Sequence, residues 1–415
     1  MGVLFVLERP SIGRGRTWLL DWALLVCLAA IAVQLIPLGP ALRATLSPAA
    51  AAAERAVAFS KASEIAAPRP LSLEPDSTGW ELASLAGYVA LFWCTRSLFS
   101  RGGIRRMTRG IAFVGLALTA LVAIQHQTSP SLFYWTWRPL AINKVTTYGP
   151  FVNRNDFAGW LTMAILLTVG YFMTRARARD RVPVDSTQVW LGGSACLMMG
   201  GLLGTLSRGG ICGGLAGLAA FVWISRTEAT GARRLLAIAA ALVAMVAIAT
   251  MYANLGALAA RLNEAEPNVG GRREVWSNTW RMAKAFWLTG VGAGAFDRGM
   301  LAYQQGTREF FFNHAHDEYL QVLAEGGVLL AVPAAVALAS GAVLIARELR
   351  HDHSSLFWVR AGAACGLLAA LVHGIWDTGL RIPANAALFA VLAAIALHDR
   401  GRRSHLGTPR TVRSR

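Results

Sequence analysis

The stretch EGGVLLAVPAAVALASGAVLIA, residues 325–346, decides the fold class. After its first residue it carries no charged side chain, and a run of about 20 apolar residues is long enough to cross a bilayer as a helix. Similar stretches recur along the chain, and together they give ten candidate spans: 18–38, 80–99, 110–126, 156–174, 188–206, 209–225, 235–254, 325–346, 358–376 and 384–398. We therefore predict an all-α polytopic membrane protein, with residues 1–415 forming a single membrane domain.

Composition and charge agree with this interpretation. Of the 415 residues, 55% are hydrophobic and only 15% are charged, whereas about a quarter of the residues in a typical soluble protein are charged. The net charge of +17 comes largely from short basic clusters between apolar runs, which is typical of cytoplasmic loops. No zinc-finger spacing or aromatic RNA-binding signature accompanies the charge, so we expect no nucleic-acid partner.

The loops predict the topology. With the N-terminus in the cytoplasm, the first loop (39–79) and the large loop (255–324) lie on the other side, and the basic tail (399–415) returns to the cytoplasm. The arginine-rich connections then also fall inside, at 100–109, 174–187, 226–234 and 347–357. The first span resembles a retained signal anchor, and cleavage in the alanine-rich stretch after Pro48 is the alternative.

A first candidate site residue lies in the short turn between the fifth and sixth spans. Ser207 is a good helix N-cap, which places Arg208 at the amino end of the sixth span. Free backbone N–H groups and a guanidinium there favour a phosphate. The alternative is an arginine that only reaches the lipid headgroups. Below this turn, glycines recur every four residues at Gly209, Gly213 and Gly217, a spacing that lets helices approach closely in lipid.

A second set lies in the large loop, on a helix predicted over 272–287 after the turn-like segment 267–271. Arg272, Trp276 and Trp280 are expected on one face of this helix, whereas Arg273 shares another face with Ser277 and Arg281. Such a helix suits the membrane interface, where it either binds a lipid-linked phosphate or merely anchors the loop.

A third set precedes the eighth span. His316 is placed to act as a general base near neutral pH. The pair His314 and His316 does not suggest a metal, because no third ligand accompanies it. Beyond the ninth span, Asp377 and Arg381 are expected to pair with each other in the outer vestibule, in a structural role. The chain lacks a P-loop, a GxSxG elbow and an Asp-x-Asp pair, and we expect neither a cofactor nor a metal.

In order, these motifs resemble the O-antigen ligase and Wzy-type polysaccharide polymerase superfamily over roughly residues 70–398. The resemblance is carried by Asn153-Arg154-Asn155-Asp156-Phe157-Ala158, Ser207-Arg208-Gly209, Arg272 four residues before Trp276, Gly290-Val291-Gly292, His316-Asp317-Glu318-Tyr319-Leu320 with Gly326-Gly327, and Arg381-Ile382-Pro383-Ala384-Asn385.

The resemblance implies a metal-independent glycosyltransferase of the GT-C-like kind in a bacterial inner (cytoplasmic) membrane, with both termini cytoplasmic. Its donor would be a glycan on undecaprenyl pyrophosphate at the periplasmic face, and the family's catalytic residues map onto Arg208, Arg272 and His316. Residues expected to bind the pyrophosphate or glycan are Arg273, Asn153, Asn155, Trp276 and Tyr319. Expected partners are an acceptor glycan, membrane lipids, and flippase and chain-length regulator proteins.

Two departures from the family pattern favour an exopolysaccharide or surface-polysaccharide polymerase. Asp317 stands where asparagine, serine or glutamine is common, and Leu330 stands where a glycine is common. Ligation of a finished glycan to lipid A core or to a protein is the alternative activity. A small-anion transporter is the alternative from another class, although most charges lie at the ends of spans rather than at mid-bilayer.

Overall fold

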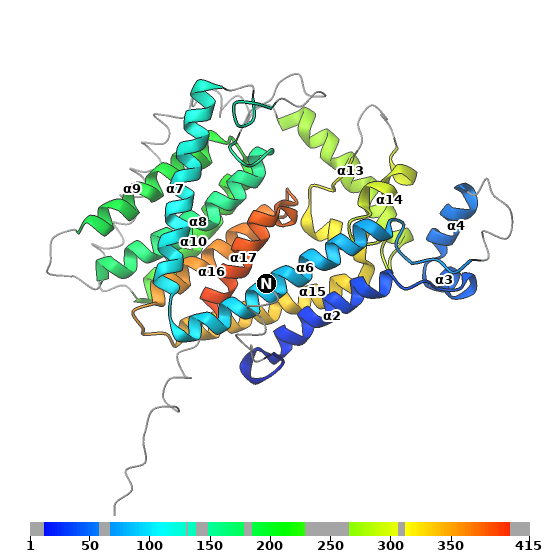
Figure 1. Cartoon of the computed structure of the whole chain (residues 1–415), viewed down its shortest axis with the longest axis horizontal. Coiled ribbons are helices and arrows are strands. Elements are labelled where there is room, and N and C mark those ends of the chain that lie inside the picture. The colour runs from blue at the N-terminus through cyan, green and yellow to red at the C-terminus, as the bar shows by residue number, and fades with distance from the viewer. Residues whose placement is uncertain are drawn as a thin grey trace, which may run out of the picture.

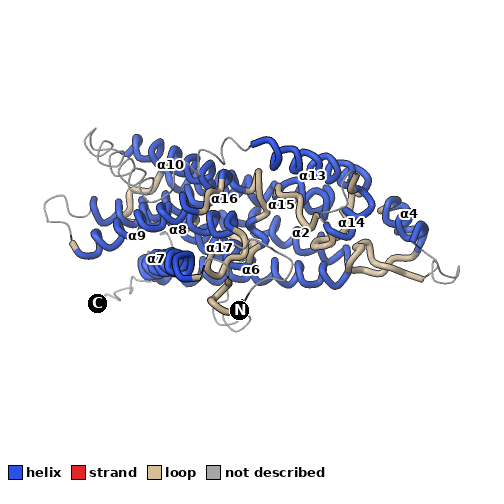
Figure 2. The backbone as a smooth tube through the Cα atoms, turned by 90° about the horizontal axis from the view of Figure 1, so that it is seen from above, coloured by secondary structure: helices blue, strands red, loops and turns tan. Residues whose placement is uncertain are grey.

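The computed structural model describes residues 12–57, 67–129, 132–137, 148–177, 185–228, 265–305 and 312–398. Within these ranges the chain is helical, apart from loops and isolated bridges (Figures 1 and 2). The span expected at 235–254 and the basic tail at 399–415 lie outside the described residues.

Long apolar helices dominate the molecule. They are α2 (Trp18–Gln34), α6 (Pro75–Arg101), α7 (Ile104–Thr128), α8 (Arg154–Arg177), α9 (Ser186–Gly204), α10 (Arg208–Glu228), α15 (Glu318–Arg350), α16 (Phe357–His373) and α17 (Pro383–Ala396). Among the described helices, six are long and apolar enough to cross a membrane, and α16 and α17 are shorter apolar helices. The prediction of an all-α polytopic membrane protein is confirmed.

Shorter helices cap one end of this bundle. The first loop holds α3 (Pro40–Leu46) and α4 (Pro48–Val57), and the large loop holds α13 (Ala265–Ala285) and α14 (Phe296–Tyr303). Two 3-10 turns, η1 (Gly15–Thr17) and η2 (Gly379–Arg381), precede α2 and α17. In Figure 1, α13 and α14 lie outside the long helices, near the ends of α2 and α15.

Glycines set the closest helix contacts. A Cβ atom at Gly213 of α10 would lie 2.5 Å from the carbonyl oxygen of Ala369 in α16, and one at Gly217 would lie 2.9 Å from that of Cys365. Only glycine allows backbones to approach this closely, as the four-residue spacing predicts. In the same way, Gly170 of α8 packs on the backbone of α16. The antiparallel pair α10 and α16 is therefore fixed in register.

The ends of the helices gather on two sides. On one side, the start of α2 meets the end of α15 through an ion pair between Arg16 and Glu348. On the other side, the amide of Gln34 at the end of α2 donates to the carbonyl of Glu325 near the start of α15, over 2.9 Å. This two-sided arrangement is the one that alternating spans predict.

The structure also accounts for a buried charge in the first span. Asp21 of α2 is fully buried, and its carboxylate accepts hydrogen bonds from Arg96 and Trp93 of α6, both over 2.9 Å. A buried carboxylate needs such a partner because desolvation of an unpaired charge is costly. Asp21 therefore has a structural role: its carboxylate joins α2 to α6.

The start of α15 is bent against the large loop. Gly327 has φ +57°, and a Cβ atom there would lie 2.4 Å from the backbone of Leu288. At this bend the backbone of α15 forms hydrogen bonds with the large loop. The N–H of Val328 donates to the carbonyl of Trp287, and the N–H of Val291 donates to the carbonyl of Ala324. The segment Gly290-Val291-Gly292 thus packs against the start of α15.

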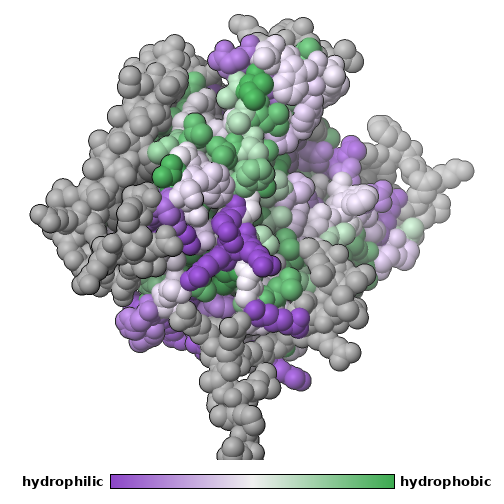
Figure 3. Space-filling model, turned by 60° about the vertical axis from the view of Figure 1, so that its left-hand side comes forward, coloured by the Kyte–Doolittle hydropathy of each residue, from purple (hydrophilic) through white to green (hydrophobic). Residues whose placement is uncertain are grey.

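The surface has an amphipathic character. Figure 3 shows hydrophilic side chains gathered in patches, with apolar side chains covering the areas beside them. Apolar side chains such as Phe113 and Val332 are exposed on the sides of α7 and α15, where a membrane protein contacts lipid.

Candidate functional site

His316 is held in a strained conformation just before α15. Its φ is +52°, which is unfavourable for a residue other than glycine. The preceding residue is fixed on both sides: the N–H of Ala315 donates to Oε1 of Gln321 over 2.8 Å, and its carbonyl accepts from Nε1 of Trp276 over 3.0 Å. The following residue, Asp317, caps α15 by accepting from the N–H of Leu320. These contacts hold the backbone of His316 in place.

The side chain of His316 faces a buried carboxylate. Its Nδ1 lies 3.6 Å from Oδ1 of Asp377, and the two side chains are 38% and 4% exposed. His373 approaches the same carboxylate from the other side, with Nε2 3.8 Å from Oδ2. The imidazole of His316 is therefore accessible, whereas its carboxylate partner is not.

Charge around Asp377 keeps it ionised. Burial by itself would raise the pKa of Asp377, but His316, His373 and the N–H of Thr378 outweigh burial and lower that pKa below its ordinary value of 3.8. An ionised carboxylate at this position orients the neighbouring imidazole and stabilises it when protonated.

His373 lies near the start of α10, which carries Arg208, and within electrostatic range of Arg272. A Cβ atom at Gly209 would lie 2.7 Å from Cδ2 of His373, so the residue directly after Arg208 packs against this imidazole. Arg272 on α13 is close enough to interact electrostatically with the same ring. Arg208 and Arg272 are 64 positions apart in sequence, and the backbone beside the first and the charge of the second both lie near His373, whose Nε2 is 3.8 Å from Oδ2 of Asp377.

Neither arginine has an acidic partner in the part of the chain that the structure describes. Both Arg208 and Arg272 are partly exposed, and neither forms a hydrogen bond or ion pair with any residue that the structure describes. The predicted cap is confirmed, because the hydroxyl of Ser207 accepts from the N–H of Gly210 over 3.2 Å. The amino end of α10 therefore presents an unpaired guanidinium, a combination that favours an anion.

Buried polar atoms without a hydrogen-bond partner concentrate around this place. In the described part of the chain they include His316 Nδ1, His373 Nε2, Asp377 Oδ2, Arg381 Nε and Asn385 Oδ1. Buried polar groups are normally satisfied, so a cluster of exceptions suits a site that binds water or a polar ligand.

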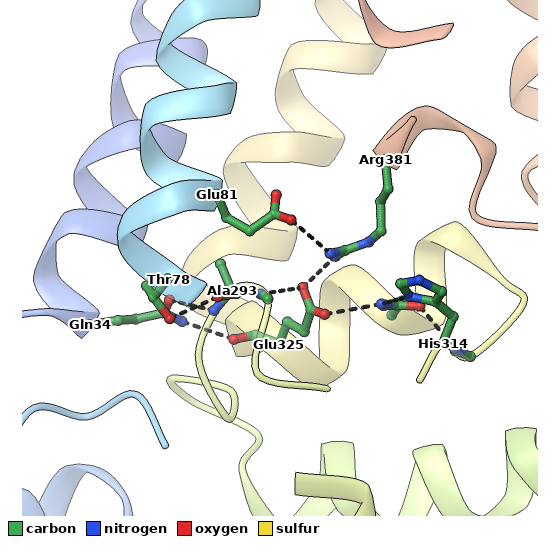
Figure 4. A network of polar contacts seen from close by, with 10 residues as sticks. Gln34, Thr78, Glu81, Ala293, His314, Glu325 and Arg381 are labelled. Carbon is green, nitrogen blue, oxygen red and sulfur yellow. Dashed lines mark hydrogen bonds and ion pairs between the residues drawn. The ribbon is translucent and has the colours of Figure 1, made fainter. Parts of the chain in front are cut away.

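The expected pairing of Asp377 with Arg381 is wrong. Arg381 instead forms an ion pair with Glu325 of α15, and its Nη1 lies 3.5 Å from Oε1 of Glu81 in α6 (Figure 4). Burial lowers the pKa of Arg381, but Glu325, Glu318 and Glu81 outweigh it and raise that pKa. The carboxylate of Asp377 instead lies beside the imidazoles of His316 and His373.

The Arg381 network reaches the His316 loop. Gln321 donates to Oε1 of Glu325 over 3.0 Å, while its own Oε1 holds the N–H of Ala315. On the other side, the backbone at Glu325 and Ala293 binds the amide of Gln34 (Figure 4). The chain of contacts thus runs from α2 and α6 to the residue before His316.

The two loop histidines point to different partners. His314 lies on the Arg381 side, with Nδ1 3.2 Å from Nε2 of Gln321, whereas His316 faces Asp377. Burial is the first cause that lowers the pKa of His314, and the charge of Arg381 adds to it. A neutral His314 suits its role in a packed polar network.

Three more of the predicted residues hold the backbone through their polar groups. Asn153 caps α8, because its Oδ1 accepts from the N–H of Asn155 over 2.9 Å. The polar ends of two aromatic residues bind backbone carbonyls: Trp276 binds Ala315, and Tyr319 donates to Leu371 over 2.7 Å.

Helix α13 differs from its prediction in where it begins and in which residues share a face. It begins at Ala265, so segment 267–271 lies in its first turns instead of forming a separate turn. Proline is compatible with a first helical turn because its missing N–H is not needed there. Trp280, expected beside Arg272, is 50% exposed and lies with exposed Arg273 on the outer face.

The sequence motifs assign no role to three residues of this region: His373, Gln321 and Glu325. Their spacing carries a signal, because His373 stands four residues before Asp377, and Asp317, Gln321 and Glu325 follow at steps of four on one helix face. The spacing gives a shared face, but only the tertiary structure shows what lies opposite it.

Fold and site together define a polytopic all-α membrane protein in which Arg208 and Arg272 have no ion pair with any described residue. Residues 193–335 match the family model for O-antigen ligase, which confirms the resemblance to the O-antigen ligase and Wzy-type polymerase superfamily. The match contains Arg208, Arg272 and His316. A comparison with curated proteins found no match. The family is one of membrane enzymes that transfer glycosyl groups.

Proposed function

We propose that this protein transfers a glycan from undecaprenyl pyrophosphate to an acceptor glycan at the periplasmic face, and so polymerises the repeat units of a surface polysaccharide or exopolysaccharide. The observation that carries the proposal is that the end of α10 bearing Arg208, the charge of Arg272 and the imidazole of His316 all lie near His373 and Asp377. These residues come from three separate parts of the chain, and the two arginines have no anionic partner among the described residues.

In this mechanism the two arginines bind the pyrophosphate. Guanidinium groups form paired hydrogen bonds with phosphate oxygens, and the amino end of α10 adds backbone N–H groups. Negative charge grows on the pyrophosphate as its bond to the sugar breaks, so fixed positive charge stabilises the transition state more than the bound donor.

His316 acts on the acceptor. With Nδ1 toward the ionised Asp377, its Nε2 is left to take the proton from the acceptor hydroxyl. The hydroxyl oxygen forms a bond to the anomeric carbon, the bond from that carbon to the pyrophosphate oxygen breaks, and undecaprenyl pyrophosphate leaves with the electron pair. The donor already stores the energy of the reaction, so no nucleotide is consumed.

Arg208→Ala and Arg272→Ala test the assignment. Each variant is expressed in a strain from which the gene has been deleted, and polymer and lipid-linked intermediates are measured. We expect polymer to fall by on the order of 100-fold, the loss typical of removing one transition-state charge contact, with normal protein in the membrane. Arg→Lys should restore part of the activity, because lysine keeps the charge but not the paired geometry.

A matched control is Arg109→Ala, which removes an exposed arginine near the start of α7 that, among the described residues, bonds within its own helix. Normal polymer yield in both Arg208→Ala and Arg272→Ala would overturn the mechanism. The deletion strain separates the two activities: one repeat unit accumulating on the lipid indicates a polymerase, and full-length polymer left on the lipid indicates a ligase.

A further inference from the structure

The outer face of α13 carries aromatic and basic side chains that the proposed chemistry does not use. Trp280 and Trp287 are 50% and 58% exposed, and basic side chains stand between and beside them. The exposed set consists of Arg273, Ser277, Trp280, Arg281, Lys284 and Trp287. Their steps of three and four residues place them on one side of the helix, with Trp287 just beyond its end.

The opposite face of α13 is occupied by the protein. Val275, Thr279 and Met282 are buried there, and Trp276 binds the loop before His316. The helix is therefore fixed by its inner face, and its outer face remains available. None of Arg273, Arg281 and Lys284 forms an ion pair with a residue in the described ranges, so their positive charge is not compensated locally.

The level of this face is set by α15. The carbonyl of Trp287 accepts from the N–H of Val328, at the bend where the uncharged stretch of α15 begins. Residues 328–346 contain no charged side chain and are about long enough to cross the hydrocarbon core. Exposed Leu329 and Val332 continue from this level into that stretch. The end of α13 therefore lies at the boundary between headgroups and acyl chains.

We propose that the outer face of α13 docks on anionic phospholipid headgroups of the leaflet on the site's side of the membrane. Tryptophan prefers this boundary because its ring is apolar and its N–H is polar, and the basic side chains complement lipid phosphates. Near an anionic surface each basic residue strengthens binding about fivefold. The lipid surface thus holds α13, and with it Arg272, at a fixed height beside the bundle (Figure 1).

The test follows the accessibility of Lys284, one of three lysines in the chain. The full-length protein is reconstituted in vesicles of phosphatidylcholine alone, or of equal parts phosphatidylcholine and phosphatidylglycerol. Reductive methylation of Lys284 by formaldehyde, with dimethylamine–borane as the hydride donor that reduces the imine, is followed by mass spectrometry; both reagents are small and uncharged. We expect several-fold slower methylation in the phosphatidylglycerol vesicles, and high salt should weaken this protection.

Two double variants decide whether the face itself is responsible. Arg273→Gln with Arg281→Gln should remove most of the protection, whereas Arg347→Gln with Arg350→Gln, an exposed pair at the opposite end of α15, should leave it intact. Thermal unfolding in detergent checks that each variant is folded.

Equal methylation rates in the two lipid mixtures would overturn the proposal, and so would unchanged protection in the Arg273/Arg281 variant. Protection by a soluble acidic polysaccharide such as alginate, without any effect of phosphatidylglycerol, would assign the face to a glycan strand and also overturn it. Glycosyl transfer is not needed for any of these measurements, so their outcome is independent of the proposed function.

Discussion

The indole N–H of Trp276 donates a hydrogen bond to the carbonyl of Ala315 over 3.0 Å, and this contact joins α13 directly to the residue before His316. Arg272 lies one helical turn away from Trp276 on the same helix. One side chain thus ties the helix that carries a proposed phosphate-binding arginine to the loop that carries the proposed base.

Trp276→Phe tests this link, because it keeps an aromatic side chain and removes the indole N–H that donates to Ala315. A single hydrogen bond contributes about 0.5–1.5 kcal/mol, so we expect turnover to fall by up to about tenfold while the protein stays folded in the membrane. Turnover is measured with purified enzyme and a lipid-linked donor. Trp223→Phe is the matched control, since Trp223 on α10 is 71% exposed and far along the helix from Arg208. Full turnover in Trp276→Phe would show that the link does not position the loop.

The ionisation of Asp377 should make the free energy of unfolding of this protein depend on pH. Its pKa in the folded protein lies below the ordinary value of 3.8, so ionisation favours the folded state. That contribution is fully present above the ordinary value and is lost as the pH falls through the lower folded value. Asp377→Asn lacks it at every pH. The gap between the thermal midpoints of the two proteins in detergent should therefore narrow as the pH is lowered below about 4. A gap that stays constant or widens on acidification would contradict the assigned direction.

Helix positions could be predicted from the sequence, because an apolar run long enough to cross a membrane has few stable structures other than a helix. The stretch at 325–346 and the turn at Arg208 appear as expected, and the glycine spacing in α10 gives the contact with α16. Charge pairing was harder to predict. Arg381 stands four residues after Asp377, but it pairs with Glu325, which lies 56 residues away in sequence. Local spacing supplies candidate pairs, whereas the choice among them depends on which helices pack together.

A double-mutant cycle on Glu325 and Arg381 tests that choice. Their side chains are 2% and 16% exposed, so Glu325→Gln leaves a largely buried guanidinium with the carboxyl groups of Glu81 and Glu318, neither of which forms a hydrogen bond with it among the described residues. Removing one partner of a buried pair costs about 3–5 kcal/mol, and removing both costs less than the sum of the two single changes. Thermal unfolding of Glu325→Gln, Arg381→Gln and the double variant measures the coupling. The same cycle on Asp377 and Arg381 should give nearly additive effects. Strong coupling of Asp377 with Arg381, and none with Glu325, would restore the pairing expected from the sequence.

Gly213 tests whether helix contact in α10 depends on the absence of a side chain. Alanine there would place its Cβ atom 2.5 Å from the carbonyl oxygen of Ala369, so α10 and α16 would have to separate. Overpacking of this kind costs about 1–3 kcal/mol, and we expect Gly213→Ala to lower the thermal midpoint in detergent. Gly200→Ala in α9 is the matched control, because among the described residues no atom from outside its own stretch of helix lies within 4 Å of its Cβ position. That control should be neutral or slightly stabilising, since alanine is the better helix former.

Gly213→Ala should also lose activity. Gly209 of the same helix packs on His373, so separation of α10 from α16 would move Arg208 away from the site. Equal midpoints for the two variants would mean that the close approach of α10 to α16 does not hold this end of the bundle together.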